Sequence, residues 1–256
     1  MLDVAIEAAK KAGELTLKYF RQSPQISYKA DKTPVTKADV ESEKLIRKII
    51  TKNFPDHGFI GEELGKTNPN SNFQWCIDPI DGTRYFAHKL PYWGILIAVL
   101  LKNRPIIGVS YMPVLNQLLV AEKGKGSFLN GRKTKVSNKK DLMNSSIANG
   151  SISYFEDIGK LENLVKLYRK VRGGKVGIGG IYGYSLVAQG IIDICVDPKS
   201  EIYDIAAPSI IVEEAGGKFS DLHGKASLTS GSFVATNGLL HDQVLKILNA
   251  PSPTRL

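Results

Sequence analysis

Two acidic residues, Asp78 and Asp81, follow a short apolar run, Trp75-Cys76-Ile77, and are separated by Pro79-Ile80. The run is too brief for a helix, so the pattern predicts a buried strand that ends in two carboxylates. Burying a bare carboxylate is unfavourable, so these two side chains are expected to be paired or to bind a metal ion. An alternative stays open, in which they are the solvated acids of an ordinary strand end.

Two further acids, Glu62 and Asp204, extend this candidate set. Carboxylates gathered in one small volume repel one another unless protons or cations neutralise them. Oxygen ligands select hard cations, and Mg²⁺ suits carboxylates combined with water and a substrate phosphate. If the fold brings these four acids together, the chain offers a site for two Mg²⁺ ions about 3.5–4 Å apart, an arrangement used for in-line displacement at phosphorus. Zinc is not indicated, because the histidines lie scattered in polar contexts, where each is predicted to be a surface residue: His57, His88, His223 and His241.

These acids belong to two longer motifs. The first is DPIDGT at residues 78–83, with Gly61-Glu62-Glu63 upstream, and the second is YDIAA at 203–207, followed by EEAGG at 213–217. In content and order they resemble the signatures of the inositol monophosphatase family, with Tyr203 where tryptophan is usual. This family of metal-dependent, lithium-sensitive phosphatases includes histidinol-phosphate phosphatases and some fructose-1,6-bisphosphatases. The resemblance covers essentially the whole chain and implies the layered α-β-α-β-α sandwich of the sugar phosphatases.

The resemblance also implies which residues hold the metal ions. Glu62, Asp78 and the backbone carbonyl of Ile80 would hold the first ion. Asp78 would bridge to the second ion, which Asp81 and Asp204 would complete.

The same resemblance implies roles around the phosphate. Glu62 and Thr83 would orient the attacking water and remove its proton, which makes both candidate catalytic residues. Asp81 and the backbone N–H groups of Gly82 and Thr83 would contact the substrate, because a helix start binds phosphate oxygens. For Thr83 an alternative is a simple helix N-cap.

A third metal is implied near Asp39. The segment KADKTPVTKAD at residues 29–39 resembles the family loop that carries an outer, metal-associated aspartate. Thr36 and Asp39 also match a helix-capping pattern, and the two interpretations are compatible.

Four local features of the sequence bear on the identity of the substrate. Arg84, LPYWG at residues 90–94 and GYSLVAQG at 183–190 look more like the histidinol-phosphate phosphatase branch than the inositol phosphatases. Asp197 stands where inositol phosphatases usually carry a glutamate that binds sugar hydroxyls, and a shorter carboxylate suits the ammonium and imidazole of histidinol. Asp197 as a plain strand-end acid stays open. Histidinol phosphate and inositol monophosphate are the expected substrates, with fructose 1,6-bisphosphate or a broad range of sugar and nucleotide phosphates as the alternative.

Composition and charge bear on whether the protein is an enzyme or a nucleic-acid-binding protein. The chain has 256 residues, 43% hydrophobic content and a net charge of +9. The basic residues are dispersed, which favours solvated faces and a weak attraction for a phosphorylated substrate. A non-enzymatic nucleotide- or RNA-binding protein is the hypothesis of another class. It would require basic and aromatic residues interleaved on one face, which the sequence lacks, so no nucleic-acid partner is expected.

Cysteine use and hydropathy indicate the compartment. Cys76 and Cys195 lie in apolar runs without a CxxC partner, as is typical of buried thiols in a reducing environment. No apolar run approaches the roughly 18 residues of a membrane span. A cytoplasmic protein without membrane contact is therefore expected, and the family resemblance implies a homodimer.

The elements that position these residues divide at a polar stretch near residue 140. Residues 1–140 are predicted to form an α+β unit with most of the metal ligands and a largely antiparallel sheet. Residues 141–256 are predicted to form an α/β unit whose helices cover a second sheet and which supplies Asp204 and substrate contacts. Helices are expected at 3–21, from 36, at 182–189, 203–215 and 239–248. Strands are expected at 59–60, 75–77, 94–101, 106–111, 117–122, 191–196 and 233–235, and residues 66–72 are expected to form a loop.

Overall fold

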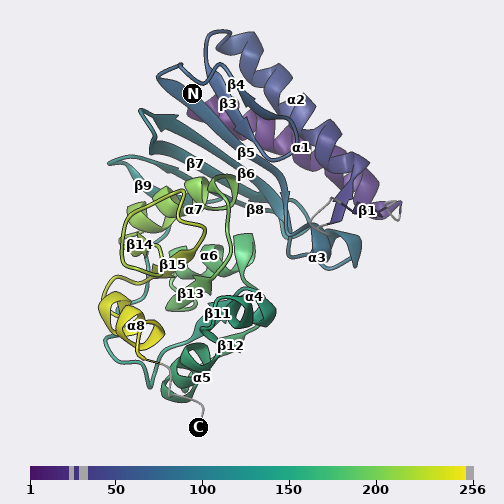
Figure 1. The fold of residues 1–256 in the computed structure, drawn as a ribbon. Helices are drawn as coiled ribbons and strands as arrows, with labels where there is room; N and C mark the ends of the chain where they lie inside the picture. Colours follow the sequence, from purple (N-terminus) through teal and green to yellow (C-terminus); the bar gives the residue numbers. More distant parts are fainter. Residues whose placement is uncertain (23–25, 29–33, 252–256) are drawn as a thin grey trace.

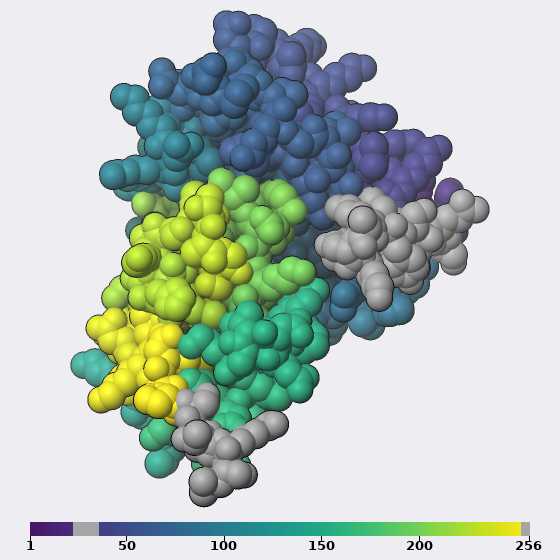
Figure 2. Space-filling view, viewed as in Figure 1, coloured from purple at the N-terminus to yellow at the C-terminus, as the bar shows by residue number. Residues whose placement is uncertain are grey.

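The computed structural model describes residues 1–22, 26–28 and 34–251. Part of the motif at residues 29–39, namely residues 29–33, lies outside this range. Helices and sheets alternate in five layers, which confirms the predicted α-β-α-β-α sandwich (Figure 1). The space-filling view shows the purple and blue N-terminal segments at one end of the molecule and the yellow C-terminal helix near the other (Figure 2).

The larger sheet has eight strands in the order β10-β9-β8-β7-β6-β5-β3-β4. Every neighbouring pair is antiparallel except β3 and β5, which are parallel, so the predicted antiparallel character is confirmed. The strands of this sheet are β3 (Gly58–Gly61), β4 (Gly65–Thr67), β5 (Phe73–Asp81), β6 (Gly94–Leu101), β7 (Arg104–Met112), β8 (Gln117–Glu122), β9 (Gly126–Leu129) and β10 (Arg132–Lys133). A separate two-stranded ribbon pairs β1 (Ile26–Tyr28) with β2 (Pro34–Thr36).

The smaller sheet has five strands in the order β12-β11-β13-β15-β14. Its strands are β11 (Ile147–Asn149), β12 (Lys175–Val176), β13 (Ile194–Asp197), β14 (Lys218–Ser220) and β15 (Phe233–Thr236). The β11 strand is parallel to both β12 and β13, and the remaining pairs are antiparallel. The two sheets lie on either side of residue 140 in the chain, and the subdomain boundary proposed there stays a prediction.

The helices cover the faces of these sheets. They are α1 (Leu2–Arg21), α2 (Lys37–Asn53), α3 (Thr83–Ala87), α4 (Ile152–Asp157), α5 (Leu161–Lys170), α6 (Gly180–Ala188), α7 (Ile202–Glu214) and α8 (His241–Leu248). On α1, Ala5, Ala8, Ala9 and Ala12 recur at helical spacing and are fully buried. These small side chains let α1 pack together with α2 against the apolar side chains of the larger sheet.

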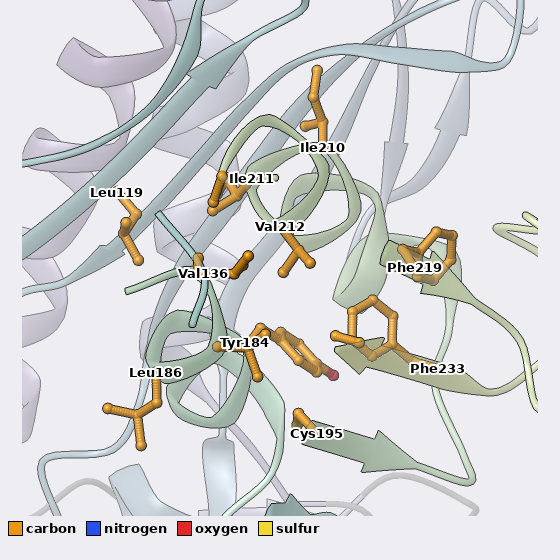
Figure 3. Close-up of a cluster of buried hydrophobic side chains, with 14 of the residues drawn as sticks. Leu119, Val136, Tyr184, Leu186, Cys195, Ile210, Ile211, Val212, Phe219 and Phe233 are labelled. Carbon is orange, nitrogen blue, oxygen red and sulfur yellow. The ribbon is translucent and has the colours of Figure 1, made fainter. Parts of the chain in front are cut away.

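The middle layer of helices lies between the sheets because strand residues alternate in direction. On β13, Ile194 and Val196 join the cluster that contains α5 and α8. Cys195 between them points the other way, into the cluster that contains Tyr184 of α6 and Val212 of α7 (Figure 3). Both cysteines are buried and unpaired, as predicted.

Several expectations from the sequence are wrong in detail. His241 is fully buried rather than exposed, and its ring nitrogens lie 2.8 Å from Ser220 Oγ and 3.1 Å from Thr236 Oγ1. Burial lowers the pKa of His241 to about 4, so the ring is neutral at physiological pH. Residues 65–67 form β4 inside the expected loop. The helices α4 and α5 and the strands β1, β2, β10, β11, β12 and β14 were not among the expected elements.

Candidate active site

Strand ends bring the first acids together. Because β3 and β5 are parallel, their carboxyl ends lie at the same edge of the larger sheet. Glu62 follows β3 directly, and its backbone N–H donates a hydrogen bond of 3.2 Å to the carbonyl of Ile77 on β5. Glu62 therefore continues the pairing of the two strands and lies beside Asp78.

An irregularity in β5 turns Asp78 and Asp81 toward one volume. Residues three apart in a regular strand point to opposite faces. Here Asp78 pairs with Leu96 and Asp81 with Gly94, so β5 contains one more residue than β6 between these pairs. Such a bulge changes the direction of the side chains that follow, and it is a position where a proline such as Pro79 is tolerated.

Asp204 reaches the same volume from α7. It occupies the third position of this helix, where its Oδ2 accepts a 2.7 Å hydrogen bond from the backbone N–H of Glu201 in a capping box. One carboxylate oxygen from each of Asp78, Asp81 and Asp204 lies within 4.8 Å of the others. Asp204 thus serves as a helix cap and also faces the other two acids.

This cluster carries unbalanced negative charge. Burial, followed by the charge of Glu62, raises the pKa of Asp78 well above its usual value. Burial, followed by the charge of Asp81, does the same for Asp204, and burial raises the pKa of Asp81 to about 7. Within the described part of the chain, no lysine or arginine forms an ion pair with any of the three. An all-oxygen cluster of this kind fits a hard divalent cation, which would supply the missing positive charge.

The acids line a pocket of about 610 Å³. Glu62, Asp78, Ile80, Asp81 and Asp204 all contribute to this one lining. The other lining residues are mostly polar or aromatic, namely Gly82, Thr83, Arg84, Tyr85, residues 149–154, Tyr168 and Gly177. The pocket lining therefore combines an acidic part with a polar and aromatic part.

Gly82 and Thr83 follow Asp81 in the chain and also line the pocket. Gly82 has a φ of 88°, and a Cβ atom there would lie 2.8 Å from the carbonyl oxygen of Tyr92, so only glycine fits without strain. Thr83 is the first residue of α3, and the N-cap is Gly82, so the interpretation of Thr83 as a simple N-cap is wrong. The Thr83 hydroxyl instead donates a hydrogen bond of 3.1 Å to the carbonyl of Ile80.

Asp39 lies outside the three-acid cluster. Its Oδ2 accepts hydrogen bonds from the Thr36 backbone N–H at 2.7 Å and from the Thr36 hydroxyl at 2.6 Å, which confirms the capping box at the start of α2. Its Oδ1 is buried and has no hydrogen-bond partner among the described residues. Burial raises the pKa of Asp39 to about 7, and the charges of Glu63 and Glu62 add to this effect. The orphaned oxygen leaves room for the predicted metal role, which stays a prediction.

Asp197 lies behind the pocket wall and is not among the lining residues. A Cβ atom on Gly150 would lie 2.4 Å from Asp197 Oδ1, so the glycine brings the carboxylate directly against the wall. Burial raises the pKa of Asp197 to about 7, and the charge of Asp81 contributes to the increase. Contact between Asp197 and a substrate stays a prediction.

Sequence reasoning missed several residues of the pocket lining, among them Asn149, Tyr154 and Tyr168. Asn149 ends β11, which is parallel to β13, so Asn149 and Asp197 lie at the same edge of the smaller sheet. The Tyr168 hydroxyl donates a hydrogen bond to Asn149 Oδ1. The available signal was the short apolar pair Ile147-Ala148 directly before Asn149, which was not among the expected strands. Ligands commonly bind at the carboxyl ends of strands.

Comparisons with known proteins show the family of the chain. The model of the inositol monophosphatase family matches residues 1–251. A histidinol-phosphatase from Chlorobaculum parvum is 40% identical over 232 residues, which are 90% of this chain and 89% of the relative. A fructose-1,6-bisphosphatase/inositol-1-monophosphatase from Thermotoga maritima is 36% identical over 252 residues, or 97% and 95% of the two chains. The crystal structure of the extragenic suppressor protein suhB from Bartonella henselae has a TM-score of 0.91 at 29% identity and covers 98% of each chain.

Fold and site together define a phosphoric monoester hydrolase with a carboxylate cluster suited to metal ions. The chain belongs to the inositol monophosphatase family, whose members depend on metal ions. In the described ranges, every helix is too short or too polar to cross a membrane.

Proposed function

We propose that the protein is a Mg²⁺-dependent phosphatase that hydrolyses a small phosphorylated metabolite, first of all histidinol phosphate. The observation that carries the proposal is the approach of Asp78, Asp81 and Asp204 within 4.8 Å in the lining of a pocket. Mg²⁺ is the cation of choice because every available ligand is an oxygen and the phosphate of the substrate can complete its coordination.

We assign the metal ions to different sets of these residues. Glu62, Asp78 and the carbonyl of Ile80 would hold one ion, and Asp78, Asp81 and Asp204 a second, with Asp39 available to an outer third. When bound, such ions neutralise charge on the phosphoryl oxygens and lower the pKa of water.

The chain itself would orient the water and the phosphate. Glu62 would accept the proton of the attacking water, and the Thr83 hydroxyl would orient that water. The backbone N–H groups of Gly82 and Thr83 would bind phosphate oxygens at the start of α3.

The polar and aromatic part of the pocket lining favours a flat, polar leaving group. Tyr154 and Tyr168 belong to this part, and a planar imidazole can stack on an aromatic ring. The Asp197 carboxyl lies directly behind Gly150, and a cation bound nearby would favour its ionised form. A cationic alcohol such as histidinol fits this combination, and the 40% identical relative carries the name histidinol-phosphatase.

Inositol monophosphate is the second candidate substrate, and fructose 1,6-bisphosphate the third, since the name of the 36% identical relative includes both activities. A broad specificity for sugar and nucleotide phosphates is consistent with the same pocket. The non-enzymatic nucleotide- or RNA-binding alternative is not better supported than the phosphatase.

A substrate panel tests the proposal. Protein stripped with a chelator is assayed for phosphate release from histidinol phosphate, inositol 1-phosphate and fructose 1,6-bisphosphate, before and after Mg²⁺ is restored. We expect activity only with Mg²⁺, the highest kcat/KM on histidinol phosphate, and inhibition by millimolar lithium. Asp197→Asn should change the ratio between substrates more than the Mg²⁺ requirement. Robust turnover after exhaustive chelation would contradict the metal assignment.

Cytoplasmic location, a role in histidine biosynthesis and a homodimer belong to the same proposal. The homodimer is tested by measuring the mass of the purified protein in solution, where a monomeric mass would contradict it.

A further inference from the structure

A buried acid outside the three-acid cluster, Glu43 on α2, lies against the segment that carries Glu62. Its side chain is 0% exposed. Its Oε2 accepts a hydrogen bond of 2.7 Å from the backbone N–H of Glu63 and one of 3.3 Å from that of Leu64. The two residues that follow Glu62 are therefore bonded to one buried oxygen.

The other oxygen of Glu43 is bonded to Arg47, one helical turn further along α2. Glu43 Oε1 lies 2.8 Å from Arg47 Nε and 2.7 Å from Arg47 Nη2. Arg47 Nη2 also donates a 2.5 Å hydrogen bond to the carbonyl of Gly65. Glu43 and Arg47 together thus bind residues 63, 64 and 65 in succession.

The chain on the other side of Glu62 is fixed as well. The N–H of Glu62 donates to the Ile77 carbonyl, one residue before Asp78. Gly61 packs so closely on α2 that a Cβ atom there would lie 1.9 Å from Glu43 Oε1. The backbone of Glu62 is therefore held between β5 and the Glu43 carboxylate.

A buried ion pair is in general no more stabilising than apolar side chains of the same volume. An apolar side chain at position 43 would lack an acceptor for the backbone N–H groups of Glu63 and Leu64. Hydrogen-bond partners of this kind orient the residues that bind a metal, and their loss typically weakens metal affinity or activity by about 10–100-fold.

We propose that Glu43 is a positioning residue, which fixes the segment 62–65 so that the Glu62 carboxylate faces Asp78 and the metal ions. This inference rests on the proposed metal-dependent function. Arg47 acts through Glu43, because it neutralises the buried charge and holds the Gly65 carbonyl.

The test compares Glu43→Gln with Asp193→Asn. Glutamine keeps the volume of Glu43, but its amide NH₂ meets either the backbone donors or Arg47. Asp193 is a matched control, since it is also 0% exposed, accepts a 2.7 Å hydrogen bond from the Ser146 N–H and pairs with Lys139 at 3.1 Å. Asp193 directly precedes β13, whereas Asp197 is the last residue of that strand, and Asp193 is not a lining residue of the pocket.

Mg²⁺ binding to each protein is measured by titration calorimetry, alongside the thermal unfolding midpoint, kcat and the KM for histidinol phosphate. We expect Glu43→Gln to weaken Mg²⁺ binding by at least about tenfold and to lower kcat, while KM at saturating Mg²⁺ changes little. Asp193→Asn should lower the unfolding midpoint and leave Mg²⁺ binding within about twofold of the parent.

Mg²⁺ binding by Glu43→Gln within about twofold of the parent would overturn the positioning role while leaving the proposed function intact. A parent protein that neither binds Mg²⁺ nor releases phosphate would overturn the proposed function itself. If Glu43→Gln does not fold, Arg47→Lys tests the inference instead. Lysine lacks the fork of donors with which Arg47 bonds the Glu43 carboxylate and the Gly65 carbonyl at the same time. Arg47→Lys should weaken Mg²⁺ binding several-fold, and unchanged binding would overturn the inference.

Discussion

The backbone N–H of Ile181 donates a hydrogen bond of 2.5 Å to Oδ2 of Asp81, although the two residues lie 100 positions apart in the chain. Asp81 ends β5 of the larger sheet, and Ile181 lies in the first turn of α6 in the layer between the sheets. One oxygen of Asp81 is thereby fixed by the second half of the chain. The site thus depends on the two halves being packed together, and neither half contains all of it.

The raised pKa values predict that metal-free protein becomes less stable as pH rises. An unfolded aspartate titrates near about 3.9, whereas burial raises the pKa of Asp81 to about 7. Between these values the folded state holds more protons than the unfolded state, so the free energy of unfolding falls as pH increases. In the presence of a chelator, we expect a lower unfolding midpoint at pH 8 than at pH 5.

Asp81→Asn is the matched variant for this prediction, because it removes one titrating group and keeps an acceptor for the Ile181 N–H. Its unfolding midpoint should vary less with pH than that of the parent. Equal slopes in the two proteins would show that the pKa of Asp81 is not raised in the folded state.

Gly61→Ala should destabilise the protein. The added Cβ atom would lie 1.9 Å from Glu43 Oε1, and crowding in a packed interior typically lowers stability by about 1–3 kcal/mol. Gly177→Ala is the control, since no atom lies within 4 Å of a Cβ atom built there. Denaturant unfolding measures both free energies. Equal stability of the two variants would contradict the close packing of β3 on α2.

The two thiols should be inert in the folded protein. Cys76 and Cys195 are 1% and 0% exposed, and burial raises the pKa of both thiols. Since the thiolate is the reactive form, a thiol reagent should label neither residue at pH 8 until a denaturant is added. Rapid labelling of the native protein, or a disulfide between the two, would contradict this arrangement.

The candidate acids came from two kinds of sequence signal. The apolar run before Asp78 and Asp81 is readable over a few residues, whereas Glu62 and Asp204 were singled out by motifs that resemble those of the family. The bulge that brings Asp78 and Asp81 to one side is harder to predict from the sequence, because it is defined only by the pairing of β5 with β6. Pro79 was its one local sign.

The polar and aromatic part of the pocket lining was not predictable in this way. Tyr154 and Tyr168 come from α4 and α5, two elements that the expected helices omitted, and they meet Asn149 only after the smaller sheet has formed. His241 was misplaced for a related reason. Its polar neighbours in the sequence suggested the surface, whereas buried hydroxyl groups from β14 and β15 satisfy both ring nitrogens.

The central claim is that Asp204 binds a metal ion as well as capping α7. In Asp204→Asn, the amide oxygen can still accept the Glu201 N–H, so the cap is kept while one charge is removed. The free energy of unfolding should be unchanged or slightly higher, because the remaining acids repel one another less.

The most direct measurement is phosphate release as Mg²⁺ is added back to chelator-treated parent and Asp204→Asn proteins. We predict that the variant needs far more Mg²⁺ and that its turnover is lower by roughly a hundredfold or more, beyond the loss typical of residues that only support a metal ligand. Near-parental activity of Asp204→Asn at low Mg²⁺ would contradict the account, because Asp204 would then be a helix cap and nothing more.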